Sequence, residues 1–438
     1  MFDMISFIER KRDGGAHTAE EIQEFVRGFA SGAVPDYQAS AWLMAVFHNG
    51  LKGEELKEFT LALAHSGKIL SFGDLRIVGK HSTGGVGDKA TLLLVPLAAA
   101  CGVKVAKLSG PGLSFTGGTV DKLEAIPGFQ MHLSSERFIE QVRRIGCAIS
   151  GHSDDLAPAE GKFYALRDVT GTVPTLPLLC SSIVSKKIAG GAHAFVFDVK
   201  CGAGAFMEDY ENAEKLARAL VSLSKSLGKE SMALITDMDQ PLGEWIGNST
   251  EVLEAVSVLQ GKGPKDVEEL VINLAGAMVS IDSDLSFEEG CALAREKLED
   301  GSGLEAFAAM VRAQGGDDRV CRTPEKILPL AGKKHTITAS EDSTVRALNA
   351  RKIGEGVKRL GGGRMSLGEP IDLSVGVRIL KKNGASAGRG EALLEILYSD
   401  EAKLADAMPF FESAYTFGKA NEHSEDTAQR RLILGKIG

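Results

Sequence analysis

Short apolar segments alternate with helical segments from Leu75 onward, and this alternation restricts the possible folds more than any other feature of the chain. Strand-like composition is found in LRIVG, VKVAKLSG, HAFVFDVK and MALITDMD, and helical runs such as NAEKLARALVSLSKSLG lie between them. Strands that alternate with helices assemble into a mostly parallel sheet, because each helix returns the chain to the edge where the next strand begins. We therefore predict the α/β fold class, with a mostly parallel sheet.

Different patterns precede and follow this region. Thr18 and Glu21 form a capping box in a helical N-terminal region, where the run AWLMAVFHNG is apolar on nearly all sides, as expected of a buried helix. Later helical stretches interrupt the strand pattern and are expected to pack back onto the N-terminal helices. After residue 332, short strands and glycine-rich turns indicate an α+β module, and the charged residues after Gly418 are expected to be loosely held. The predicted domains are a helical domain (1–66 and 158–190), an α/β domain (67–157 and 191–331) and a C-terminal α+β domain (332–438).

Composition excludes several classes of protein. The formal net charge of −9 argues against a nucleic-acid partner, which would require clustered Lys and Arg. The chain has neither an 18-residue apolar run nor a signal-peptide pattern at its start, so we expect no membrane partner. The six cysteines and nine histidines are scattered, without CxxC or HExxH spacing. These features predict a cytoplasmic enzyme with reduced cysteines and no transition-metal site.

The strongest local motif is the glycine-rich loop at 80–88, KHSTGGVGD, between a predicted strand and a predicted helix. Its backbone N–H groups and the following helix N-terminus favour an anion, and Lys80 and Ser82 add donors. A tight turn without a ligand is the alternative. The loop also matches the dinucleotide fingerprint GxGxxA, but the next strand ends in Lys and Ser rather than in an acidic residue. The nucleoside-triphosphate motif GxxxxGK[ST] is absent, which argues against an ATPase.

A second loop of the same kind, SGPGLSFTGGT, spans residues 109–119, again after a strand and before a helix. Parallel strands end at the same edge of a sheet, where ligands of open α/β sheets bind. We therefore expect both loops to share one anion, and we predict that this anion is phosphate.

Three polar residues in the interrupting helices form a third motif. Ser182 and Lys186 are four residues apart and share one helical face, within the otherwise apolar run LPLLCSSIVS. With Arg167 they would offer donors to two carbonyl oxygens and a hydroxyl to a ring N–H, as the edge of uracil or thymine requires. The alternative is a solvated helix edge with a cap.

Together these residues resemble the thymidine/pyrimidine-nucleoside phosphorylase family along nearly the whole chain. The most specific matches are KHSTGGVGDK, TGGTVDKLE, YALRDVTGTV, SSIVSKK and DVKCGAGAFM. The resemblance implies a homodimer with its active site in a cleft between the helical and α/β domains. It implies phosphate binding by Lys80, Ser82, Thr91, Ser109 and Thr119, catalysis by His81, Arg167 and Lys186, and substrate binding by Lys107, Leu113, Arg167, Ser182 and Lys186.

The implied activity is reversible phosphorolysis of uridine, thymidine and deoxyuridine to the free base and (deoxy)ribose 1-phosphate. His81 would lie near the base O2 and stabilise or protonate the leaving group, and Lys107 would favour acceptance of both ribose and deoxyribose. Alternatives are a thymidine phosphorylase restricted to deoxyribonucleosides, an enzyme like anthranilate phosphoribosyltransferase, and a catalytically inactive binding protein of the same fold.

The chain departs from the family pattern at a few positions. Gly79 replaces the usual Asp, and Pro111 and Phe115 replace an Arg and a His. Some members of the family bind potassium through a residue that is Lys89 in this chain. A lysine there could replace the cation, so no cofactor is predicted. The other residues at this position are Gly87, Leu242, Trp245 and Glu254.

Overall fold

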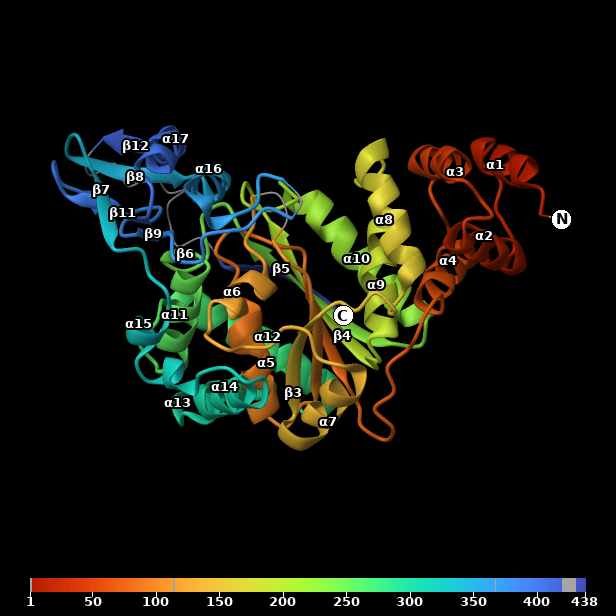
Figure 1. Ribbon diagram of the computed structural model, residues 1–438, viewed down its shortest axis with the longest axis horizontal. Coiled ribbons are helices and arrows are strands. Elements are labelled where there is room, and N and C mark those ends of the chain that lie inside the picture. The colour runs from red at the N-terminus through yellow and green to blue at the C-terminus, as the bar shows by residue number, and fades with distance from the viewer. Residues whose placement is uncertain (1, 113–114, 367, 420–430) are drawn as a thin grey trace.

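The computed structural model describes residues 2–112, 115–366, 368–419 and 431–438. The N-terminal helices lie at one end of the molecule and the C-terminal strands and helices lie toward the other, with the central sheet between them (Figure 1). The C-terminus returns to the middle of the molecule, beside the central sheet.

The helical part is built from two separate segments of the chain. Phe163 joins them, because its ring packs 4.3 Å from Phe29 and 5.4 Å from Phe59, measured between ring centroids. This contact confirms that the later helices pack back onto the N-terminal ones, and the predicted capping box of Thr18 and Glu21 is present. The helices are α1 (Met4–Arg12), α2 (Ala19–Ser31), α3 (Asp36–Asn49), α4 (Glu54–Ala64), α8 (Pro158–Thr170) and α9 (Leu176–Ala189).

The central sheet has the predicted parallel arrangement. Its order is β1 (Val78–Ser82), β4 (Ala194–Cys201), β5 (Glu230–Asp237) and β13 (Ile433–Ile437), of which the first three are parallel. A second parallel pair, β2 (Val105–Ser109) and β3 (Cys147–Gly151), lies next to β1, where the Val78 amide donates to the Lys104 carbonyl at 3.0 Å. The fold class is confirmed.

Helices cover this sheet, because packing them against it buries the apolar faces of both. In α5 (Ala90–Ala100) every residue from Ala90 to Ala98 is buried, and it packs against α12 (Lys265–Asp282) in the main core. The other helices of this part are α6 (Thr119–Glu124), α7 (Ser135–Ile145), α10 (Tyr210–Ser226), α11 (Ser249–Leu259), α13 (Phe287–Glu299), α14 (Ser302–Ala313) and α15 (Pro324–Ile327).

The C-terminal part contains two antiparallel sheets, as the predicted α+β module requires. One has the order β6 (Trp245–Gly247), β9 (Gly376–Ile379), β11 (Ala392–Tyr398) and β7 (Lys333–Thr338). The other has the order β10 (Ser386–Ala387), β8 (Ser343–Leu348) and β12 (Tyr415–Lys419), and the helices are α16 (Ala350–Val357) and α17 (Glu401–Glu412).

Two strands pair with a sheet in a different part of the molecule from their neighbours in sequence. β6 comes from the central region but pairs with β9, and β13 is the last strand of the chain but pairs with β5. The prediction that the chain is loosely held after Gly418 is therefore wrong for residues 433–437, since these residues complete the edge of the central sheet. The part of this prediction that concerns residues 420–430 lies outside the described residues. The exact domain boundaries stay a prediction.

Candidate active site

The first glycine-rich loop begins later than the sequence predicts. β1 continues through Ser82, because His81 and Ser82 pair in register with Phe197 and Asp198 of β4. The Ser82 hydroxyl donates to Asp88 Oδ2 at 2.6 Å, so it closes the loop on itself. His81 and Ser82 therefore project from the carboxyl end of a strand, where the sheet holds their backbone in place.

Lys80 is the buried cation of this strand end. Its Nζ donates to the Thr91 hydroxyl of α5 at 3.2 Å and lies 3.9 Å from Asp198 Oδ2. Burial lowers the pKa of Lys80, while Asp88 and Asp198 act in the opposite direction. Lys80, Ser82 and Thr91 are brought together as the proposed phosphate site requires.

The second glycine-rich loop starts at the end of β2. Lys107 Nζ donates to the Ser109 hydroxyl at 3.2 Å and to the Leu108 carbonyl at 2.9 Å. Thr119 begins α6 at the far end of the loop and is partly exposed. Leu113 lies outside the described residues. The two loops are linked, since Lys122 in the last turn of α6 donates to the Asp88 carbonyl at 2.8 Å.

Two carboxylates, the buried Asp198 and the partly buried Asp88, lie close to these lysines, and neither was predicted as a site residue. Asp198 pairs with Lys200 at 2.8 Å and accepts a hydrogen bond from Thr236 at 2.7 Å. Burial acts to raise the pKa of Asp88, but Lys200, Lys80 and Lys122 hold it well below its ordinary value. Asp198 and Lys200 belong to the motif DVKCGAGAFM, which was the only sequence signal for them.

The structure brings the third predicted group together on α8 and α9. Arg167 is buried, and its Nη1 donates to the Ser182 hydroxyl at 2.8 Å. Lys186 pairs with Glu160 at 2.8 Å and keeps 31% of its side chain exposed. Both cations lie over the ring of Tyr164, at 5.9 Å for Arg167 and 5.6 Å for Lys186. Glu160 and Tyr164 complete this group, and the sequence analysis missed both.

His81 is held as a neutral imidazole. Loss of water around the ring lowers its pKa well below 6.5, and the nearby cations, Lys187 foremost, lower it further. A neutral imidazole offers one N–H donor and one acceptor. His81 can therefore donate a hydrogen bond at neutral pH but is not a protonated acid there.

A lysine ammonium occupies the position considered for potassium. Lys89 Nζ donates to the Leu242 carbonyl at 2.8 Å, the Trp245 carbonyl at 2.9 Å and Glu254 Oε2 at 2.6 Å. Burial acts to lower the pKa of Lys89, but Glu254 and Glu251 outweigh it and the pKa is raised. Gly87 has a φ of +74°, and a Cβ there would lie 2.5 Å from the Leu242 carbonyl oxygen, so glycine is required.

Two of the departures from the family pattern, Gly79 and Phe115, have local structural reasons, whereas nothing in the structure explains Pro111. A Cβ on Gly79 would lie 3.1 Å from the Ala192 Cβ and 3.4 Å from the Phe195 ring, so a larger side chain has little room. Phe115 is buried against the C-terminal part, with the Arg351 guanidinium 5.0 Å from its ring centre. Pro111 is exposed.

Comparisons with known proteins agree with this geometry. The α/β domain of the glycosyl transferase family matches residues 74–304, its helical bundle domain matches residues 5–67, and the pyrimidine nucleoside phosphorylase C-terminal domain matches residues 344–418. A pyrimidine-nucleoside phosphorylase of Staphylococcus haemolyticus (strain JCSC1435) is 48% identical over 396 residues, which cover 90% of this chain and 91% of the relative. One of Geobacillus stearothermophilus is 46% identical over 406 residues, covering 92% and 93%. The chain belongs to the pyrimidine-nucleoside phosphorylase family.

A solved structure shares the fold of this phosphorylase-family chain. The crystal structure of anthranilate phosphoribosyltransferase from Thermus thermophilus covers 70% of this chain and 98% of its own, with a TM-score of 0.57 and 22% sequence identity. This likeness concerns the fold alone.

In this family member the C-terminal part also contacts the second glycine-rich loop, at 109–119, and the helix α6 that follows it. Arg364 pairs with Asp121 Oδ1 at 2.7 Å, and Asp121 Oδ2 accepts a hydrogen bond from the Gly112 amide at 2.6 Å. Phe115 and Val86 also belong to the apolar core of the C-terminal part. The C-terminal part therefore packs against both glycine-rich loops.

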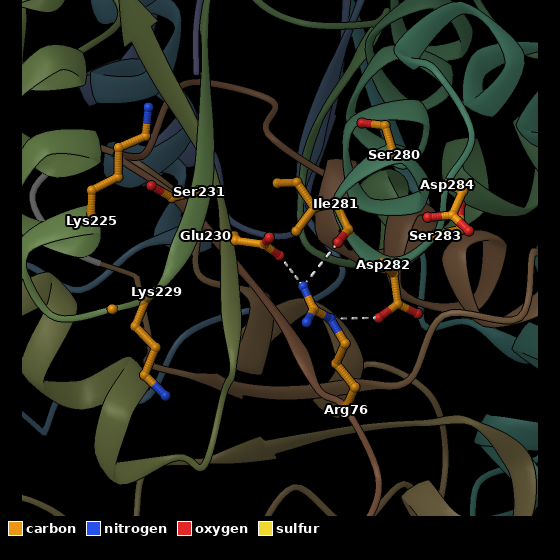
Figure 2. Close-up of a pocket in the computed structure, with 11 residues that line it drawn as sticks. Arg76, Lys225, Lys229, Glu230, Ser231, Ser280, Ile281, Asp282, Ser283 and Asp284 are labelled. Atoms are coloured by element: carbon orange, nitrogen blue, oxygen red, sulfur yellow. Dashed lines mark hydrogen bonds and ion pairs between the residues drawn. The ribbon is translucent and has the colours of Figure 1, made fainter.

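A separate hollow of about 730 Å³ lies at the opposite edge of the central sheet. Figure 2 shows Arg76 at its centre, bonded to Glu230, to Asp282 and to the Ile281 carbonyl. Glu230 begins β5, so this hollow is at the amino ends of the strands and is not part of the site at their carboxyl ends.

Metal-binding clusters and membrane-spanning helices are both absent from the described residues. In the described ranges, no group of three or more His, Cys, Asp or Glu side chains is placed to hold a metal ion. No described helix is both long enough and apolar enough to cross a membrane.

Proposed function

We propose that this protein catalyses the reversible phosphorolysis of pyrimidine nucleosides. The observation that carries the proposal is the presence of two donor sets: Lys80, Ser82, Thr91 and Ser109 at the carboxyl ends of the strands, and Arg167, Ser182 and Lys186 on α8 and α9. Lys186 of the second set is also a charged neighbour of His81 on β1. The first set suits a phosphate dianion and the second suits the carbonyl edge of a pyrimidine.

The reaction needs charge stabilisation more than proton abstraction. As the bond between C1 of the sugar and the base nitrogen breaks, its electron pair stays with the base, and a phosphate oxygen forms the new bond to C1. Donors from Arg167 and Lys186 would stabilise the negative charge that develops on the base oxygens. His81 would add one N–H toward O2 as a neutral donor. The phosphate itself is the nucleophile, so the lysines position it and no general base is required.

The substrate range depends on the groups beside the sugar and the base. Lys107 offers an amine at the end of β2, and an amine can donate to a 2′-hydroxyl whereas a thioether is only a weak acceptor. We therefore propose that uridine, deoxyuridine and thymidine are all cleaved. We expect cytidine to be cleaved poorly, since its 4-amino group would present donors to Arg167.

Release of the free base from each nucleoside, measured with and without phosphate, tests this function. Cleavage that requires phosphate and yields the sugar 1-phosphate is expected. Uridine turnover a hundredfold below that of thymidine would favour a thymidine phosphorylase instead. The variant Lys107→Met should lose uridine activity more than thymidine activity if this side chain sets the range.

A phosphoribosyltransferase activity, the alternative from the sequence analysis, can be tested directly. That enzyme class would act on phosphoribosyl diphosphate with magnesium. Turnover with these two compounds, but not with uridine and phosphate, would establish it and would leave Arg167, Ser182 and Lys186 unexplained.

We propose that the protein acts as a homodimer in the cytoplasm, without a metal cofactor. The apolar helix α3 buries one face, but Tyr37, Met44 and Phe47 on its other side are 75%, 41% and 40% exposed. Their spacing places them on one face, which a second copy of the chain would cover. All six cysteines are free, as in a reducing compartment. Sedimentation should give twice the chain mass, and the double variant Met44→Glu with Phe47→Glu should sediment as a monomer.

A further inference from the structure

Lys187 on α9 is a buried cation that the proposed mechanism does not use. Only 8% of its surface is exposed, and its side-chain amine forms no hydrogen bond or ion pair with any residue in the described part of the chain. Its neighbour Lys186 is different, because it is partly exposed and paired with Glu160. A buried lysine without a carboxylate partner is costly, so the position requires an explanation.

Several cations and imidazoles interact electrostatically with Lys187: Lys186 on α9, Lys80 and His81 on β1, Lys107 on β2, and the exposed His152 after β3. The carboxylates of this region have other partners, since Asp198 pairs with Lys200, Asp88 accepts a hydrogen bond from Ser82, and Glu160 pairs with Lys186. Lys187 is the strongest charged neighbour of both His81 and Lys107. It therefore lies between the base-binding helix and the ends of the two strands that carry the phosphate loops.

Burial and the neighbouring cations both favour the unprotonated forms of the Lys187 and Lys107 amines. Burial, then repulsion by Lys186 and Lys80, lowers the pKa of Lys187 to about 7. The pKa of Lys107 is also well below its ordinary value, through burial and through Lys187. A dianion placed among these amines would reverse the repulsion and favour their charged forms.

We propose that Lys187 is a phosphate-binding residue, which takes up a proton when the phosphate dianion enters the site. This inference rests on the proposed function, because it places phosphate between the two glycine-rich loops. It means that α9 contacts both substrates: Ser182 and Lys186 face the base, and Lys187 faces the phosphate. Binding of phosphate would thus hold the helical part against the α/β part.

Calorimetric titration of the full-length protein with inorganic phosphate tests this assignment without any turnover. Titrations near neutral pH in two buffers of different ionisation enthalpy give the number of protons taken up. Sulfate is titrated in parallel, since it stays a dianion across this range and brings no proton of its own. The variants are Lys187→Met, Lys187→Arg and, as a matched control, Lys225→Met at an exposed position outside the site.

We expect Lys187→Met to raise the Kd for phosphate at least tenfold and to reduce the proton uptake with sulfate. Lys187→Arg should keep the affinity within a few-fold but lose the same part of the uptake, because a guanidinium is already charged. Without phosphate, the Tm of Lys187→Met should equal or exceed that of the unaltered protein, since an unpaired buried amine has been removed. A purely structural lysine would instead give a lower Tm and an unchanged Kd.

The possible failures are distinguishable. Absence of phosphate binding by the unaltered protein would overturn the proposed function and this inference with it. Normal phosphate binding and proton uptake in Lys187→Met would overturn the inference alone and leave the phosphorylase function in place.

Discussion

Arg167 donates a hydrogen bond to the Ser182 hydroxyl at 2.8 Å, and this contact joins α8 to the helix that carries Lys186. Arg167 also donates to the Leu178 and Val173 carbonyls, at 3.2 and 2.8 Å. It therefore has two roles, since it would bind the base and it also holds the turn between the two helices. Lys186 stabilises the fold less, because its side chain pairs with Glu160 and lies over the Tyr164 ring but does not hold the turn between the helices.

This difference gives the first prediction. Lys186→Ala should abolish most turnover while the protection that phosphate gives against heat stays intact. Arg167→Ala should lose turnover and also lower the Tm, because four acceptors, the Ser182 hydroxyl and three backbone carbonyls, lose their donor. Activity assays and thermal melts with and without phosphate make the comparison. Loss of phosphate protection with normal nucleoside binding in Lys186→Ala would reverse the assignment of the two sites.

The phosphate site should depend on the charge of Lys80. Hydrogen bonds that involve a charged group contribute roughly 1.5–3 kcal/mol each, so Lys80→Ala should raise the KM for phosphate at least tenfold. The exposed Lys225→Ala is the control and should leave this KM unchanged. Unchanged phosphate saturation in Lys80→Ala would show that the first loop is not the phosphate site.

His81 should act as a neutral donor throughout the neutral range. Because its pKa lies well below 6.5, no loss of kcat from His81 deprotonation is expected as the pH rises from 6 to 8. His81→Ala should lower kcat more than it changes nucleoside binding, since stabilisation of the leaving group acts in the transition state. His81→Asn, which keeps an N–H donor, should retain more activity. A kcat that falls with rising pH near 6.5, and only when His81 is present, would instead indicate a protonated acid.

The Tm of the protein should not depend on which monovalent cation is present, because the Lys89 ammonium occupies the position of the cation. Thermal melts of the unaltered protein in potassium chloride and in choline chloride are expected to coincide. Lys89→Ser leaves Glu254 buried without its partner, a change that costs about 3–5 kcal/mol in comparable buried pairs. Potassium should restore part of the lost Tm in this variant, and choline should not. A potassium effect on the unaltered protein would contradict this account.

Acid should destabilise the helical part through His17. Its Nε2 accepts a hydrogen bond from Trp42 Nε1 at 3.2 Å, and its ring stacks on Phe7 with centroids 3.5 Å apart. Burial foremost, then Lys11, lowers the pKa of His17 to about 4. Between pH 6.5 and 4 the unfolded chain therefore binds the proton that the folded protein excludes, so stability falls as the pH falls.

For a single histidine this effect is about 1 kcal/mol between pH 7.5 and 5.5. Urea unfolding at both pH values measures it. His17→Gln should lose less stability on acidification than the unaltered protein, whereas His48→Gln, at an exposed position, should behave like the unaltered protein. Equal acid sensitivity in all three proteins would remove His17 as the cause.

The sequence alone was sufficient for features that depend on local pattern. Strand and helix alternation after Leu75 predicts the parallel sheet, since period and turn chemistry are local properties. The position of Lys80, Ser82 and Ser109 at one sheet edge follows from the same pattern, because parallel strands end together. Even here the boundary was misplaced, since pairing with β4 extends β1 through His81 and Ser82.

Tertiary structure decided what depends on contacts between distant residues. β13 joins β5 across nearly 200 residues of sequence, and no local signal marks that pairing. Lys186 and Lys187 are adjacent in sequence, yet the partly exposed Lys186 pairs with Glu160 of α8 and Lys187 is buried near other cations. Adjacent residues on a helix point about 100° apart, so only the surrounding elements determine which lysine meets a carboxylate and which is left for a ligand.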